Sequence, residues 1–207
     1  MARMIDAAHP LLLGSASPRR WQLLETLGLP LIRAVADVDE EPRSGEAVDA
    51  YLERIAAAKL AAVGTTDAAR ASGAVLVADT AVVLGEVLMG KPRDDADAVA
   101  ILRGLSGREH EVRTRFAVAT PERATSALVA QTVVTKVRFR KLDQEEIERY
   151  VATGEGRDKA GAYAVQGIGG FAVERIDGSY SNVVGLPVCE VVLALRRTGL
   201  LGAFPLV

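Results

Sequence analysis

Two arginines directly follow a helix-capping turn near the start of the chain. The turn Ser-Ala-Ser-Pro at residues 15–18 comes after a short apolar run, and Arg19 and Arg20 come next. Ser17 is a favourable helix N-cap, and Pro18 suits the first helical position. Free backbone N–H groups and the helix dipole favour an anion there. The pattern predicts an anion site, and a pair of solvated surface arginines is the alternative.

Two lysines also stand in unusual surroundings. Lys59 falls on the apolar stripe of a helix predicted over about residues 46–63. Its amine either reaches past the core to the surface or belongs to a binding site. Lys91 lies in a Gly-Lys-Pro turn at 90–92, where an ordinary turn lysine is the alternative to a phosphate contact.

Carboxylates accompany these cations. Asp79 comes directly after the apolar segment 74–78, which reads as a buried strand. Ligand sites gather at such strand ends in open sheets, although a helix or turn cap is an equal alternative. The acidic run at 37–41 is either a solvated loop or a source of hard oxygen ligands for a divalent ion. A triphosphate with a metal ion would satisfy a cationic pocket that also holds carboxylates.

Several common chemistries leave no trace in the sequence. It contains no GxxxxGK[ST] phosphate loop, no GxGxxG motif and no GxSxG nucleophile elbow. His9 and His110 are far apart and form no metal-ligand spacing, so we expect each to be structural or solvated.

Composition narrows the class of protein. The 207 residues are 49% hydrophobic, enough for one core or for two lobes that share a sheet. A net charge of −2 lacks the basic footprint of a nucleic-acid binder. Cys189 is the single cysteine, which excludes an intrachain disulfide and suits a reducing compartment; its apolar surroundings predict a core position. The apolar runs are too short for a signal peptide or a membrane span, so we expect a cytoplasmic protein.

The elements that must position these residues read as an α/β protein. Strands and helices are interleaved without strict βαβ alternation, which predicts a mixed sheet flanked by helices. The glycine-rich segment 157–170 has no clean period. We expect strands at 11–13, 74–78, 112–118, 131–139 and 171–176, a hairpin of 81–84 with 87–89, and helices at 18–27, about 46–63, after Asp94 or Asp95, at 143–153 with a capping box, and from Pro187 to about 198.

Blocks spaced along nearly the whole chain resemble the Maf family. Each block is weak alone, but their number and order make the resemblance specific. They are residues 12–20 with 23–24, 39–40, Lys59, 78–80, 90–92, 105–107 with His110, 158–167, and 184–187.

The resemblance implies a single domain over residues 1–207. Its fold would be an elongated, two-lobed mixed α/β body with a central cleft, related to the inosine triphosphate pyrophosphatases. Maf proteins cleave nucleoside triphosphates between the α and β phosphorus with a divalent metal, Mg²⁺ or Mn²⁺, and are often homodimers. The partner is thus a nucleoside triphosphate, with no nucleic acid and no membrane.

The block that ends at Gln166 is similar to the subgroup that acts on dTTP and UTP. Another base preference, such as 7-methyl-GTP or modified nucleotides, and a nucleotide-binding regulator of cell division are the alternatives. Ala164 stands where many relatives carry glycine, and Gly156 where proline is common. Because Ala164 lies near Gln166, the first departure bears on fine specificity.

The resemblance also implies roles for individual residues. Phosphates would contact Arg20, Lys59 and Lys91, and Asp79 would accept a proton from the attacking water or only orient it. The Gln166 amide offers a donor and an acceptor that complement the imide edge of uracil or thymine. The full set is catalytic Asp79, Lys91 and Lys59; substrate-binding Ser15, Arg19, Arg20, Thr80 and Gln166; and metal-binding Glu40 and Asp79.

Overall fold

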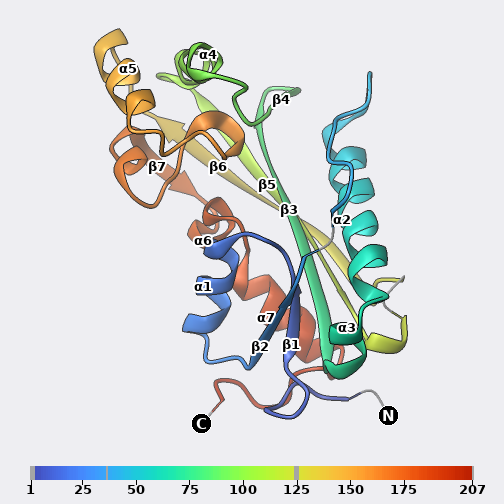
Figure 1. Ribbon diagram of the computed structural model, residues 1–207. Helices are drawn as coiled ribbons and strands as arrows, with labels where there is room; N and C mark the ends of the chain where they lie inside the picture. The colour runs from blue at the N-terminus through green and yellow to red at the C-terminus, as the bar shows by residue number, and fades with distance from the viewer. Residues whose placement is uncertain (1–2, 36, 124–125, 207) are drawn as a thin grey trace. The chain divides into compact units, whose positions relative to one another are not determined.

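A computed structural model describes residues 3–35, 37–123 and 126–206 of the chain. Its seven strands form one mixed sheet in the order β2-β1-β3-β5-β6-β7, with β4 paired to β3 (Figure 1). The strands are β1 (Leu11–Gly14), β2 (Leu31–Ala34), β3 (Ala74–Leu84), β4 (Val87–Met89), β5 (Glu109–Ala119), β6 (Val129–Phe139) and β7 (Val173–Asp177).

The helices begin and end largely where capping residues predict. Ser17 caps α1 and Asp94 caps α4, while Asp143 and Glu146 form a reciprocal capping box on α5. They are α1 (Pro18–Thr26), α2 (Val48–Gly64), α3 (Asp67–Ala71), α4 (Asp95–Leu105), α5 (Gln144–Ala152), α6 (Tyr180–Val184) and α7 (Val188–Arg197), with short 3₁₀ turns η1 (Pro121–Arg123), η2 (Ala160–Ala162) and η3 (Ile168–Ala172).

Parallel pairing of the first strands fixes the position along the sheet of the first site residues. β1 runs parallel to both β2 and β3, and its register places Gly14 opposite Val77. The next residues along are Ser15 and Ala78. A Cβ on Gly14 would lie 2.7 Å from Val77 Cγ1 and 3.0 Å from Val63 Cγ2, so this close packing requires glycine.

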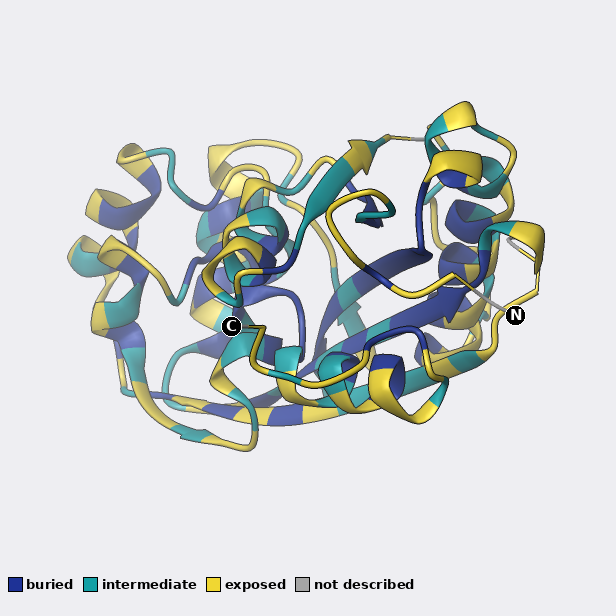
Figure 2. Cartoon of the chain, turned by 90° about the horizontal axis from the view of Figure 1, so that it is seen from below, coloured by how far each residue is buried: buried dark blue, intermediate teal, exposed yellow. Residues whose placement is uncertain are grey.

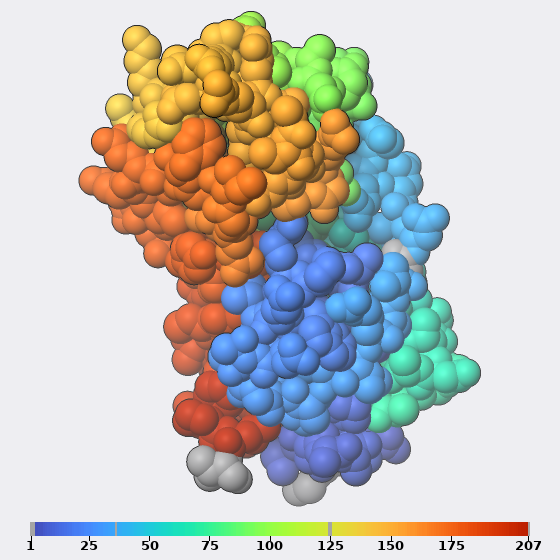
Figure 3. Space-filling view, turned by 60° about the vertical axis from the view of Figure 1, so that its left-hand side comes forward, coloured from blue at the N-terminus to red at the C-terminus, as the bar shows by residue number. Residues whose placement is uncertain are grey.

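The chain divides into two compact units. Unit 1 comprises Met1–Asp79, Thr114–Thr132 and Gly185–Val207, and unit 2 comprises Thr80–Arg113 and Val133–Val184. Strands β1, β3 and β5 are mostly buried, whereas the other strands are largely half-buried or exposed and the helices expose their outer faces (Figure 2). Within unit 1, α2 contacts β1 and α3 contacts β2; the segments near residues 10–35 and 40–70 meet on the face in Figure 3.

Each unit has its own apolar cluster. In unit 1, α2 contributes Leu60 and Val63, which pack against Leu12, Val75 and Val77 of the sheet. In unit 2, buried side chains of α4 and α5 pack on β5 and β6; the cluster includes Leu102, Leu105, Val112, Val137, Phe139, Ile147 and Tyr150.

Some sequence-based expectations were wrong. The strand predicted to stop at Asp79 runs on through Leu84, because the Asp79 carboxylate has a buried cationic partner and need not end the strand. Strand β2 and the short helices α3 and α6 were not predicted. Cys189 is exposed rather than in the core, since α7 buries the opposite face with Val191, Ala194 and Leu195.

No helix in the described part of the chain combines the length and apolar character needed to cross a membrane.

Candidate active site

Three charged side chains of unit 1 converge although they are distant in sequence. Lys59 Nζ, from α2, lies 2.6 Å from Asp79 Oδ1 and 2.6 Å from Glu40 Oε1. Lys59 and Asp79 are only 9% and 7% exposed, whereas the Glu40 side chain is 39% exposed. A buried ammonium between two carboxylates is therefore open to solvent on the Glu40 side.

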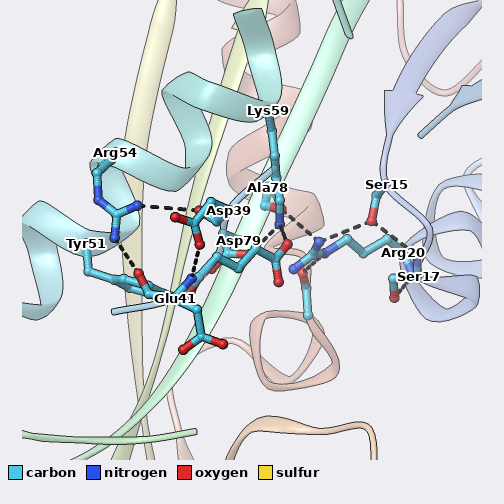
Figure 4. Close-up of polar contacts among 12 residues, drawn as sticks. Ser15, Ser17, Arg20, Asp39, Glu41, Tyr51, Arg54, Lys59, Ala78 and Asp79 are labelled. Atoms are coloured by element: carbon cyan, nitrogen blue, oxygen red, sulfur yellow. Dashed lines mark hydrogen bonds and ion pairs between the residues drawn. The ribbon is translucent and has the colours of Figure 1, made fainter. Parts of the chain in front are cut away.

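A buried arginine occupies the first turn of α1, close to this cluster (Figure 4). The Arg20 Nε donates to Gly185 O at 2.8 Å, and Nη1 donates to Ala78 O at 2.8 Å and to Ser15 Oγ at 3.2 Å. Ser17 Oγ accepts the Arg20 backbone N–H at 3.5 Å. The guanidinium is thus fixed by the carboxyl end of β1, by β3 and by the turn before α7.

Electrostatics link the two groups. Burial lowers the pKa of Arg20 from its ordinary value, and the negative charges of Asp79 and Glu40 oppose that shift while Arg19 adds to it. The pKa of Tyr51 is raised, first by burial and then by the charges of Asp79 and Glu40. These mutual effects mean that the cations and carboxylates act on one another, in surroundings that weaken charge screening.

Helix α2 also holds the acidic segment in which Glu40 lies. Tyr51 donates from its hydroxyl to Glu40 O at 3.2 Å, and Arg54 Nη2 donates to Glu41 O at 3.0 Å. Arg54 in turn makes two hydrogen bonds of 2.7 Å to the Glu46 carboxylate. Sequence reasoning missed these supporting residues. The i, i+4, i+8 spacing of Tyr51, Ile55 and Lys59 indicates only that Tyr51 shares a helix face with Lys59, and it gives no sign of the contacts to the acidic segment.

Other expected site residues belong to unit 2. Thr80 is half-buried in β3, and Lys91 and Gln166 are exposed. The carbonyl of Gly90, next to Lys91, accepts a hydrogen bond of 3.1 Å from Gly161 N.

The turn that makes this contact has unusual backbone angles. Gly161 and Ala162 have φ of 73° and 58°, a left-handed conformation that is strained for alanine. The hydrogen bond from Gly161 N to Gly90 O connects this segment, residues 160–162, to the turn that carries Lys91.

The structure thus brings Ser15, Arg20, Glu40, Lys59 and Asp79 together in unit 1. Arg19, which precedes Arg20 in the sequence, is half-buried. A buried Lys–carboxylate cluster with a fixed arginine can bind a polyanion and a hard cation.

The family model described as "Maf-like protein" matches residues 10–198. The chain belongs to this family. The Maf-family resemblance of the sequence blocks is confirmed.

Relatives across bacteria match over almost their full length. A protein of Geobacter sulfurreducens named dTTP/UTP pyrophosphatase is 54% identical over 92% of this chain and 97% of its own. Proteins of the same name from Myxococcus xanthus and Hahella chejuensis are 50% and 46% identical, each over 92% of this chain and covering 93% and 92% of their own lengths.

A solved structure from Mycobacterium abscessus, titled nucleoside-triphosphatase / dITP/XTP pyrophosphatase, aligns with 92% of this chain and 96% of its own. It has a TM-score of 0.43 and 14% identity, and a likeness at that level supports no conclusion.

Proposed function

We propose that this Maf-family chain is an enzyme that hydrolyses dTTP and UTP to the nucleoside monophosphate and pyrophosphate. The observation that carries the proposal is the buried Lys59 ammonium between Asp79 and Glu40, beside the fixed guanidinium of Arg20. The names of relatives 46–54% identical support the same activity and the same pair of substrates.

The cations of the site would neutralise the negative charge of the triphosphate, which is the main obstacle to the reaction. A triphosphate carries roughly four negative charges, which repel an incoming oxygen nucleophile until they are neutralised. Arg20 contributes a charge that its protein contacts hold in place, and Lys59 and Lys91 contribute ammonium groups to the phosphates. Ser15, at the carboxyl end of β1, adds a polar contact, and Arg19 lies at the same helix N-terminus.

The same residues fit a divalent metal ion. Glu40 and Asp79 aim one carboxylate oxygen each at Lys59 Nζ, so both can supply oxygen ligands to one region of space. No group of three or more His, Cys, Asp or Glu suited to a metal occurs among the described residues. That fits Mg²⁺ or Mn²⁺, because such ions often use one or two carboxylates and complete their shell with phosphate oxygens and water. A bound ion would neutralise phosphate charge and polarise the phosphorus under attack.

In the proposed reaction, water attacks the α phosphorus. The bond from that phosphorus to the bridging oxygen breaks, and pyrophosphate leaves with the bonding electrons. Asp79 orients the water and takes its proton. Gln166 and Thr80, with Arg19, set the base preference, and the Gln166 amide pairs with the imide edge of the pyrimidine.

The decisive experiment measures pyrophosphate release from dTTP, UTP, CTP, dGTP and 7-methyl-GTP with Mg²⁺ and with Mn²⁺. We expect fast release from dTTP and UTP, reduced at least about a hundredfold in Asp79→Asn, the order expected when one catalytic group is lost. The matched control Asp67→Asn removes an exposed carboxylate from the first turn of α3 and should leave the rate unchanged.

Other outcomes would point to the alternatives. Faster release from 7-methyl-GTP than from dTTP would assign another base preference. Tight triphosphate binding without turnover would favour a nucleotide-binding regulator. Glu40→Gln should raise the metal concentration needed for half-maximal rate, and Glu53→Gln, which removes an exposed carboxylate of α2, should not.

We also propose a homodimer, as the resemblance implies, and a cytoplasmic location, which the single exposed Cys189 and the lack of any possible intrachain disulfide support. Light scattering on a size-exclusion column tests the first point, and fractionation of the producing cell tests the second.

A further inference from the structure

The glycine-rich segment around Gln166 is held at both ends although its tip is exposed. Residues 166–168 are exposed, whereas Ala164 and Gly169 on either side are buried. A loop tip of this kind is ordinarily mobile because few contacts restrain it. Here the restraints come from two side chains that lie earlier in the sequence, Tyr150 of α5 and Glu155 just after it.

The Glu155 carboxylate binds the C-terminal side of the loop. Its Oε1 accepts the Ile168 N–H at 2.9 Å, and its Oε2 accepts the Gly169 N–H at 2.8 Å. The pKa of Glu155 reflects this: burial raises it, but the hydrogen bonds from Gly169, Ile168 and Tyr150, together with the charge of Lys159, outweigh burial and the pKa is lowered. The bonds therefore favour the ionised carboxylate.

The Tyr150 hydroxyl extends the contact to the N-terminal side. It donates to Glu155 Oε2 at 2.9 Å and accepts the Ala164 N–H at 3.2 Å. Tyr150 is itself only 4% exposed, so its ring is fixed by the core of unit 2. The two side chains thus form one hydrogen-bonded clamp on the three loop residues Ala164, Ile168 and Gly169.

The glycines of the loop fit this clamp closely. A Cβ on Gly167 would lie 2.2 Å from Glu155 Oε1, and one on Gly169 would lie 2.6 Å from the Tyr150 hydroxyl. Gly167 also has a φ of 100°, which favours glycine. The backbone therefore passes directly over the clamp, with Gln166 at the exposed tip.

We infer that Glu155 and Tyr150 are positioning residues for base recognition, because they fix the loop that presents the Gln166 amide to the pyrimidine. This rests on the role given to Gln166 in the proposed function. A loop backbone that is already fixed loses less conformational freedom on binding and limits the positions from which the Gln166 amide can reach an imide edge. The clamp raises selectivity for the base without touching the phosphates.

The test uses binding, so that it does not depend on turnover. Calorimetry would give the affinities of the α,β-imido analogues of dTTP and dGTP, whose bridging NH resists hydrolysis, for wild type, Glu155→Gln, Tyr150→Phe and Gln166→Ala. We expect the wild type to prefer the dTTP analogue. Each variant should lose about tenfold of that preference, the order of one hydrogen-bonded contact. Glu155→Gln combined with Gln166→Ala should lose no more than Gln166→Ala alone.

The matched control is Glu146→Gln. Glu146 also accepts a backbone N–H, that of Asp143 at 3.0 Å, and lies in the same unit but outside the loop. We expect it to lower thermal stability and leave the base preference intact. Amide hydrogen exchange at Ile168 and Gly169 should speed up in Glu155→Gln and Tyr150→Phe, and not in the control.

The outcomes separate this inference from the proposed function. A base preference that survives both clamp variants but falls in Gln166→Ala would overturn the inference alone. A wild type without any base preference would overturn both the inference and the base recognition proposed for Gln166. A wild type that prefers the dTTP analogue, loses the preference in the clamp variants and releases no pyrophosphate would uphold the inference and sink the proposed hydrolysis. Tyr150→Phe keeps the buried ring, so it supplies the answer if Glu155→Gln does not fold.

Discussion

The Lys59 ammonium lies between two carboxylates that would otherwise repel each other, so its loss should lower the stability of the fold. Lys59→Met would remove the ammonium that contacts both carboxylates and would leave the buried Asp79 facing Glu40, with the Arg20 charge nearby. Removing one partner of such a pair costs about 3 kcal/mol of unfolding free energy. Urea unfolding should show that loss, and pyrophosphate release should fall at least about a hundredfold because a phosphate contact goes with it.

A partner variant and a control sharpen this prediction. Adding Asp79→Asn to Lys59→Met removes the buried charge that has lost its ammonium partner, so part of the lost stability should return. Lys136→Met breaks only an exposed ion pair with Glu109, 3.6 Å long, and should change stability by less than about 0.5 kcal/mol. A Lys59→Met protein as stable as the wild type would contradict the pairing.

Glu46 gives the protein a specific sensitivity to acid. Its pKa is lowered from 4.5 to about 2, chiefly by hydrogen bonds from the Arg54 side chain and then by the Arg43 backbone N–H. A lowered folded-state pKa stabilises the fold above the unfolded value, and that contribution disappears as pH falls from 4.5 towards 2. Urea unfolding over this range should show a steeper loss for wild type than for Glu46→Gln; parallel curves would argue against the Arg54 contact.

Single residues were the part of the site most accessible from sequence. Lys59 was conspicuous because a lysine interrupts an apolar stripe, and Arg20 because it follows a capped turn. The Tyr51 and Arg54 contacts to the acidic segment were not predictable, since they depend on where an irregular loop passes over α2. A loop without periodicity leaves no pattern from which its path can be read.

Among the helices and strands, the helices that begin at a clear capping residue were predicted well. Capping residues located α1, α4 and α5 to within about two residues, which is the usual uncertainty of helix ends. The helices α3 and α6 have five residues each, too few to show a helical period. Strand β3 was cut short because a charged residue was taken as its end, and only tertiary pairing with Lys59 makes Asp79 compatible with a strand interior.

The packing of β1 against its neighbours predicts a second stability effect. Gly14→Ala would place a methyl group 2.7 Å from Val77 Cγ1 and 3.0 Å from Val63 Cγ2. Overpacking of this kind costs about 1–3 kcal/mol, and denaturant unfolding measures it. Gly104→Ala is the control: within α4 its Cβ would meet only Met89 Cε, at 3.9 Å, so helix propensity should stabilise the protein by up to about 1 kcal/mol. Equal effects of the two changes would contradict the close contact at Gly14.

At the scale of the whole molecule, the sequence predicted the α/β class and the mixed sheet. The division into units could not be read from it, because unit 1 assembles from three separate stretches of the chain. Local sequence patterns indicate which face of an individual helix or strand is buried. The assembly of distant stretches depends instead on long-range pairing such as that of β1 with β3. The expected cleft between two lobes and the single domain over residues 1–207 stay predictions.

The strands themselves argue for one cooperative domain. The unit boundaries fall inside β3, between Asp79 and Thr80, and likewise inside β5 and β6. Unfolding one unit would therefore break strands that the other unit needs. We expect thermal unfolding in a single transition, with equal midpoints from the fluorescence of Trp21 in unit 1 and from the NMR resonances of His110 in unit 2.

Truncation of a core side chain tests directly whether the two units unfold together. Leu105 is fully buried in the cluster of unit 2, so Leu105→Ala should cost about 2–5 kcal/mol. If the units unfold together, this change lowers the midpoints of Trp21 and His110 equally, although Trp21 lies in the other unit. A lower His110 midpoint with an unchanged Trp21 midpoint would mean that the chain folds as two domains, because the strand interiors would then separate without mutual cost.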